Sequence, residues 1–172
     1  MRAGKSVWGY HCVSPTPNIY LNSFVDVPLA KQRLIPWLAA QSNLTGWLYW
    51  YINYGWVHSD ISSGDKAKVA PLPLLDPVGH STYDARVSNG AFWTNEDGNW
   101  MYPGQHGPLS SLRLEAWRRG LEDRALLALL TPAQRAELSG RLVRSASNWT
   151  IDPRLMEQTR ADAAALVGTL VC

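Results

Sequence analysis

Cysteine and phenylalanine are both scarce in this chain. Its 172 residues include two of each. Cys12 and Cys172 stand near opposite ends, and one widely spaced pair is not the pattern of a small disulfide-stapled domain. We therefore expect both cysteines to be free thiols. Stability must then come from a hydrophobic core, for which a chain of 172 residues is long enough.

Long apolar runs and a strong charge of one sign are also missing. No apolar run approaches the roughly 20 residues of a membrane-spanning helix, and residues 1–6 lack the apolar segment of a signal peptide. The net charge is only +2, and the basic residues form no stripe of the kind that binds nucleic acid. The sequence therefore predicts no membrane and no nucleic-acid partner, and it leaves the cellular compartment unknown.

The familiar motifs of metal, phosphate and nucleophile sites are absent as well. His58, Asp60, Asp65 and His80 are the nearest approach to a ligand set, but their spacing matches no recognised metal motif. The chain has no phosphate-binding loop and no Gly-x-Ser-x-Gly elbow. We therefore predict no metal site and no cofactor, and acyl-transfer and nucleotide chemistry have no support.

Tryptophan and tyrosine, in contrast, are abundant. The chain has nine Trp and seven Tyr. These rings combine a flat apolar face with a polar edge, and sugars offer matching surfaces, with apolar C–H faces ringed by hydroxyl groups. Large aromatic side chains are mostly buried in any protein, so core or groove lining is the alternative for each ring. The composition is compatible with sugar binding and does not demand it.

Hydrophobic patterning predicts an α/β fold. Strands are expected at residues 7–13, 46–52 and 100–102, with the second covered on both faces. Helices are expected at residues 29–42, with a kink or late start at Pro36, and at residues 108–130. Two more begin at Thr131 and Asp152, each followed by proline. Residues 58–99 form a long loop. The alternation predicts three parallel strands, side by side in sequence order, with helices on the outer side.

The helix over residues 108–130 is amphipathic. Four apolar residues should face the core: Leu114, Trp117, Leu121 and Ala128. Charged residues at four-residue spacing should form ion pairs on the solvated face, namely Glu115 with Arg119, Arg118 with Glu122, and Arg119 with Asp123. Arg113 is predicted to belong to this solvated lattice. The alternative is that Arg113 braces the structure behind a sugar site.

Three blocks of sequence occur together and in a fixed order. They are Val7-Trp8-Gly9-Tyr10-His11-Cys12, Gly46-Trp47-Leu48-Tyr49-Trp50 with Asn53, Tyr54 and Trp56, and the segment from Tyr102 to Asp123. Together they resemble the closing part of the catalytic domain of glycoside hydrolase family 123, which includes β-N-acetylgalactosaminidases. The resemblance implies a (β/α)8 TIM-type barrel. Residues 1–130 would form its last three βα units, and residues 131–172 a C-terminal helical extension.

The resemblance also implies a retaining, substrate-assisted mechanism. The sugar's 2-acetamido oxygen attacks the anomeric carbon, an Asp orients the acetamido group, and the adjacent Glu is the general acid/base; this departs from the usual two-carboxylate scheme. The chain contains no Asp-Glu dipeptide, and Glu96-Asp97 and Glu122-Asp123 have the reverse order. No catalytic residue is therefore assigned, and the isolated chain is expected to be inactive. It resembles a fragment that contributes the aromatic half of an N-acetylhexosamine site.

Sites of such barrels lie at the carboxyl ends of the strands. This places five substrate-binding candidates: Tyr10, Trp50, Asn53, Trp56 and Tyr102. In the functional interpretation, the tryptophans stack on a sugar ring, the tyrosines donate hydrogen bonds to sugar oxygens, and Asn53 binds a sugar hydroxyl. In the structural alternative, the tryptophans pack on a helix, the tyrosines donate to protein groups, and Asn53 ends its strand in an Asx turn.

Several partners and classes of function stay open. The expected ligand is an amino-sugar glycan, and the expected protein partner is the missing N-terminal half of the barrel or a second copy of the chain. Such partners are expected because an incomplete barrel leaves the edge and inner face of its first strand uncovered. The alternatives are a non-catalytic carbohydrate-binding remnant and an inert truncated product.

Overall fold

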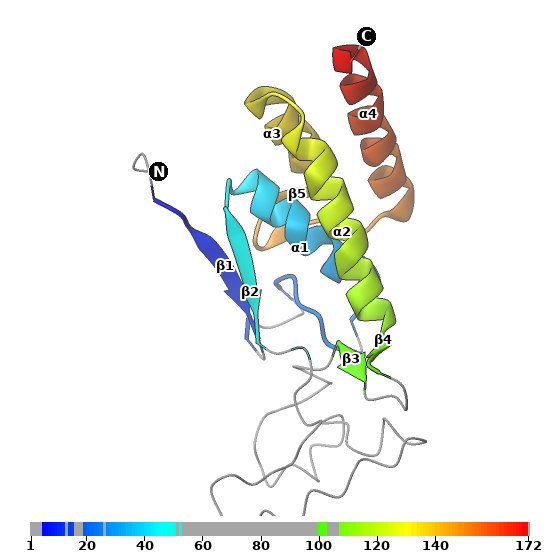
Figure 1. Cartoon of the computed structure of the whole chain (residues 1–172). Coiled ribbons are helices and arrows are strands. Elements are labelled where there is room, and N and C mark those ends of the chain that lie inside the picture. The colour runs from blue at the N-terminus through cyan, green and yellow to red at the C-terminus, as the bar shows by residue number, and fades with distance from the viewer. Residues whose placement is uncertain are drawn as a thin grey trace, which may run out of the picture.

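The computed structural model describes residues 5–12, 14–15, 19–25, 27–50, 52, 100–102 and 107–171. Helices and small sheets alternate along this part of the chain (Figure 1). In order they are β1 (Trp8–His11), α1 (Leu29–Gln41), β2 (Gly46–Tyr49), β3 (Met101–Tyr102), β4 (Leu109–Ser110), α2 (Leu112–Ala128), α3 (Pro132–Leu142), β5 (Val143–Ser145), β6 (Asn148–Trp149) and α4 (Pro153–Val171). The long loop expected at residues 58–99 lies outside the described residues.

The first two strands pair in parallel, as predicted. Trp8 pairs with Gly46 and His11 with Tyr49, and α1 connects the two strands as a crossover helix. The helix runs through Pro36 without a break, although proline removes one backbone donor. One face of this two-stranded sheet turns towards the helices, since α1 lies between the sheet and α2 (Figure 1). The prediction that β2 is covered on both faces is wrong, because Leu48 is exposed.

The third predicted strand forms, but its pairing differs from the prediction. Met101 pairs antiparallel with Ser110, and Tyr102 with Leu109. The parallel three-stranded order is therefore wrong for the part of the chain that the structure describes. The short segment before α2 folds back beside β3 and supplies the nearer hydrogen-bonding partner. The closed barrel needs eight strands and stays a prediction.

Helices α1 and α2 meet at Gly120. A Cβ atom at this position would lie 2.4 Å from the backbone oxygen of Arg33 and 2.9 Å from the Cγ atom of Pro36. Glycine therefore permits the close contact between the two helices. On both sides of this contact, buried residues from α1, α2, α3 and α4 form one hydrophobic core that includes Trp37, Leu127, Leu138 and Met156.

The buried face of α2 differs from the predicted one. Trp117 packs against the core, but Leu121 and Ala128 are exposed. The residues that face inward are instead Arg113, Gly120, Asp123 and Leu127. Two of the four are charged, so a pattern of apolar residues alone points to the wrong stripe.

The predicted helix starts of the C-terminal region are confirmed. Thr131 and Gln134 form a capping box at α3, and the Asp152 carboxylate accepts a hydrogen bond from the backbone N–H of Arg154 at the start of α4, at 2.9 Å. The antiparallel β5–β6 hairpin between these helices was not predicted. Since α3 and α4 share the core of α1 and α2, residues on both sides of position 130 contribute to it. No helix in the described ranges is long and apolar enough to cross a membrane.

Candidate carbohydrate site at the carboxyl ends of β1 and β2

The carboxyl ends of β1 and β2 meet the segment that leads into β3. The Trp50 amide donates to the backbone oxygen of His11 at 3.1 Å, so the parallel pairing continues past Tyr49. The amides of Trp100 and Met101 both donate to the backbone oxygen of Ile52, at 2.9 and 3.0 Å. In α/β folds, binding sites form at the carboxyl ends of parallel strands.

His11 is buried at this edge of the sheet, and both of its ring nitrogens form hydrogen bonds. Its Nδ1 atom accepts a hydrogen bond from the Trp47 indole N–H at 2.8 Å. Because an indole N–H can only donate, the ring proton must be on Nε2, which donates to the Ser23 hydroxyl at 2.8 Å. Burial lowers the pKa of His11 to about 3. The imidazole is therefore neutral at physiological pH and has a structural role, not that of a general acid.

Four aromatic rings stack behind the strand ends. The rings of Tyr49 and Trp100 are 4.0 Å apart with an interplanar angle of 12°, and the His11 ring lies 4.5 Å from Tyr49 and 6.0 Å from Trp100. Trp117 from α2 lies 5.1 Å from Trp100. The stack is largely buried, so these rings form the packed support of the site and not an open platform.

Arg113 joins α2 to this support, and the prediction that it lies on a solvated face is wrong. Its side chain is 4% exposed. One terminal nitrogen donates to the hydroxyl oxygen of Tyr102 at 2.9 Å, and the other donates to the backbone oxygen of Ser23 at 3.2 Å. The contacts fit the alternative in which Arg113 acts as a brace. Tyr102 is thereby held in place from the α2 side.

Tyr10 and Trp50 lie on the opposite face of the sheet. Alternation sends Tyr10 away from the buried His11, and Trp50 away from Tyr49. Tyr10 is 51% exposed and Trp50 is 41% exposed. At the other end of the same face, the Trp8 ring covers Gly46 so closely that an added Cβ atom would lie 2.5 Å from it. The face away from the helices is therefore aromatic along its length and open.

Of the five predicted site residues, three can be placed. Tyr10 and Trp50 share the open face, whereas Tyr102, which belongs to the β3–β4 pair, is hydrogen-bonded to the buried Arg113 on the side of the helices. Asn53 and Trp56 lie outside the described residues. Sequence reasoning missed the role of Ser23 and gave the brace only as the alternative for Arg113. A single polar residue in a loop and a charged residue in an amphipathic helix carry no local signal for such contacts.

No group of three or more His, Cys, Asp or Glu side chains gathers for metal binding in the described ranges. Cys12 is a free thiol there, as predicted, while Cys172 and the histidine and aspartate set at residues 58–80 lie outside them. Among the described residues, the strand ends offer aromatic side chains that can stack and form hydrogen bonds.

Two comparisons bear on this site. The family model described as glycoside hydrolase 123, catalytic domain, matches residues 1–130, which span every element from β1 to α2. No curated protein matches the chain.

Proposed function

This chain belongs to the family of glycoside hydrolase 123 catalytic domains, and we therefore propose that it binds an N-acetylhexosamine unit of a glycan at the carboxyl ends of β1 and β2. Family membership makes the chain glycoside hydrolase-like and its partner a carbohydrate. The identity of the sugar, the residues that contact it and the mechanism belong to the proposal.

The observation that carries the proposal is the open aromatic face next to the strand ends. Tyr10 and Trp50 are exposed although both are large aromatic residues, which are usually buried. An exposed indole at a strand end is suited to stack on the apolar C–H face of a sugar ring, while the hydroxyl group of Tyr10 on the same face is suited to its oxygens. The buried stack of His11, Tyr49, Trp100 and Trp117 keeps the strand ends rigid beneath this surface.

The chain itself supplies no catalytic carboxylate pair in this proposal. The substrate-assisted mechanism needs an Asp to orient the acetamido group and a Glu to protonate the leaving oxygen, and no Asp-Glu dipeptide occurs in the sequence. Glu122 forms exposed ion pairs on α2, and Asp123 is buried among arginines, so neither lies at a strand end. The pair Glu96-Asp97 lies outside the described residues. His11 is neutral and buried, and it cannot replace the acid.

A second polypeptide would then complete the site. The open face of the β1–β2 sheet presents Trp8, Tyr10, Leu48 and Trp50, all of them exposed. An apolar face of this kind favours association with another chain. We propose that the partner carries the Asp-Glu pair and covers this face, so that the glycan binds between the two polypeptides.

A non-catalytic carbohydrate-binding protein is the second candidate, because the sequence lacks the Asp-Glu pair. The two candidates differ in one measurement. Only the first predicts hydrolysis of an aryl β-N-acetylgalactosaminide after the chain is mixed with the part of a family member that carries the Asp-Glu pair. Binding without hydrolysis in the same mixture would favour the second.

Titration of the chain with N-acetylgalactosamine, followed by NMR, tests the site. Trp50→Ala should weaken binding about tenfold, a change that corresponds to about 1.4 kcal/mol. Trp8→Ala is the matched control, because Trp8 is 63% exposed on the same face but at the amino end of β1. Equal affinities of the wild-type chain and Trp50→Ala would refute the assigned site.

A further inference from the structure

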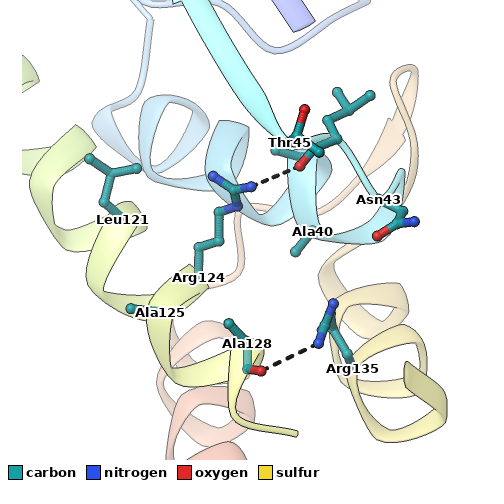
Figure 2. A pocket seen from close by; sticks show the side chains of 10 residues that line it. Ala40, Asn43, Thr45, Leu121, Arg124, Ala125, Ala128 and Arg135 are labelled. Carbon is teal, nitrogen blue, oxygen red and sulfur yellow. Dashed lines mark hydrogen bonds between the residues drawn. The ribbon is translucent and has the colours of Figure 1, made fainter. Parts of the chain in front are cut away.

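A second candidate site lies at the opposite end of β2. A cavity of about 500 Å³ opens where α1 and α2 end and α3 begins, and Asn43, Leu44 and Thr45, just before β2, form one side of it (Figure 2). This volume is in the range of small-ligand sites. The location is distinct from the proposed sugar site, which lies at the carboxyl end of the same strand.

The cavity exists because small residues follow the close helix contact. Arg33 and Pro36 of α1 touch α2 at Gly120. Further along the two helices from that contact, the residues are Ala39 and Ala40 on α1 and Ala125 and Ala128 on α2, and all four line the cavity. Their methyl groups leave the space between the helices unfilled, so the cavity has an apolar wall.

Two arginines line this cavity, and neither pairs with a carboxylate of the described residues. Arg124 donates through one terminal nitrogen to the Leu44 backbone oxygen at 2.7 Å. Arg135 donates to the backbone oxygens of Leu127, Ala128 and Leu130 at 3.2, 3.4 and 3.3 Å. A guanidinium has five N–H donors, so both keep donors in reserve. No Asp or Glu is among the described residues that line the cavity.

The charge of the cavity is positive even when the helix ends are counted. The carboxyl ends of α1 and α2 each contribute a partial charge of roughly −0.5, and the amino end of α3 contributes roughly +0.5. The two guanidinium groups therefore exceed the local negative charge. Figure 2 shows Arg124 and Arg135 reaching in from different helices, with Leu121 and Ala125 beside Arg124.

We propose that this cavity binds a small organic carboxylate with a hydrocarbon body. A guanidinium matches the two oxygens of a carboxylate with parallel hydrogen bonds. The alanine and leucine wall accommodates an apolar group. Benzoate is a suitable probe because it combines both parts, and benzyl alcohol has a similar shape without the charge.

The test is an NMR titration of the full chain with benzoate. We expect saturable shifts confined to residues 39–45 and 121–135, and about tenfold weaker binding of benzyl alcohol, since hydrogen bonds to charged groups contribute more than neutral ones. Arg124→Gln should weaken benzoate binding by a similar factor. Arg154→Gln, which removes an exposed arginine outside the cavity, should leave it unchanged.

Ala125→Leu is a second variant that keeps both arginines and fills the space. It should abolish saturable binding while far-UV circular dichroism shows the same helix content. Three results would overturn the proposal: no saturable shifts with benzoate, equal binding of benzyl alcohol, or unchanged benzoate affinity in both Arg124→Gln and Ala125→Leu. Any of these would mean that the arginines only cap helix and loop carbonyls.

Discussion

Asp123 should be among the most sensitive positions of the fold. Its carboxylate is 1% exposed and lies between α1, α2 and α4. It accepts hydrogen bonds from Arg33 Nε at 2.7 Å, from Arg160 Nε at 2.9 Å and from the Trp37 indole N–H at 3.1 Å. Asp123→Ala would leave two arginines without their shared anion and a buried indole N–H without an acceptor.

The expected cost follows from these contacts. Removing one partner of a buried ion pair typically destabilises a protein by about 3–5 kcal/mol, and the total stability of a domain is only about 5–15 kcal/mol. The neighbouring Glu122 is the matched control, because it is also an acid on α2 but forms only exposed ion pairs with Arg118 and Arg119. Glu122→Ala should change stability far less, since exposed pairs contribute little.

Urea denaturation measures the difference. Tryptophan fluorescence reports unfolding, and the midpoint at constant m-value gives the change in the free energy of unfolding. A double variant of Asp123→Ala with Arg160→Ala should cost less than the sum of the single changes, because the two residues share one network. Comparable losses for Asp123→Ala and Glu122→Ala, or additive losses in the double variant, would contradict the buried network.

Three further outcomes are expected. Burial lowers the pKa of His11 from 6.5 to about 3 in the folded state, so the unfolded chain binds one more proton between these pH values. The free energy of unfolding should therefore fall by about 2 kcal/mol from pH 7.5 to pH 5. Urea denaturation of His11→Gln should lack this part of the decrease. Gly120→Ala should destabilise the chain, because the new methyl group would clash with the carbonyl oxygen of Arg33. The control Gly168→Ala in α4 places its methyl group where nothing lies within 4 Å, and it should stabilise the chain slightly. Equal thermal midpoints of the two variants would refute the close helix contact. The purified chain alone should not hydrolyse aryl β-N-acetylhexosaminides, because positioned acid–base catalysis supplies about 10²–10⁴-fold in rate, and turnover above buffer would point to Glu96 as an unrecognised acid.

Local signals predicted those features that depend on neighbours in the chain. The capping box at Thr131 and the cap at Asp152 were predicted because the residues that satisfy the first helical N–H groups are adjacent in sequence. The parallel pairing of β1 with β2 followed from a strand, a helix and a strand in order. The family was evident from three aromatic blocks, and the match over residues 1–130 confirms it.

The site was only partly predictable. Alternation along β1 sends Tyr10 and His11 to opposite faces, and Tyr10 is exposed while His11 is buried. Which polar groups surround His11 was not predictable, because Ser23 and Trp47 reach it from a loop and from the next strand. The five binding candidates themselves stay predictions until a sugar is titrated.

The sequence by itself determined where the two C-terminal helices begin, that the first two strands are parallel and which family the chain belongs to, because these depend on short-range hydrogen bonding and on residue order. Only the tertiary structure decided what each charge does. Glu122 and Asp123 are adjacent acids on one helix, yet one is exposed and the other is buried between two arginines from other helices. A rotation of about 100° per residue separates them, and which side meets α1 and α4 is settled by packing at Gly120, not by helical propensity.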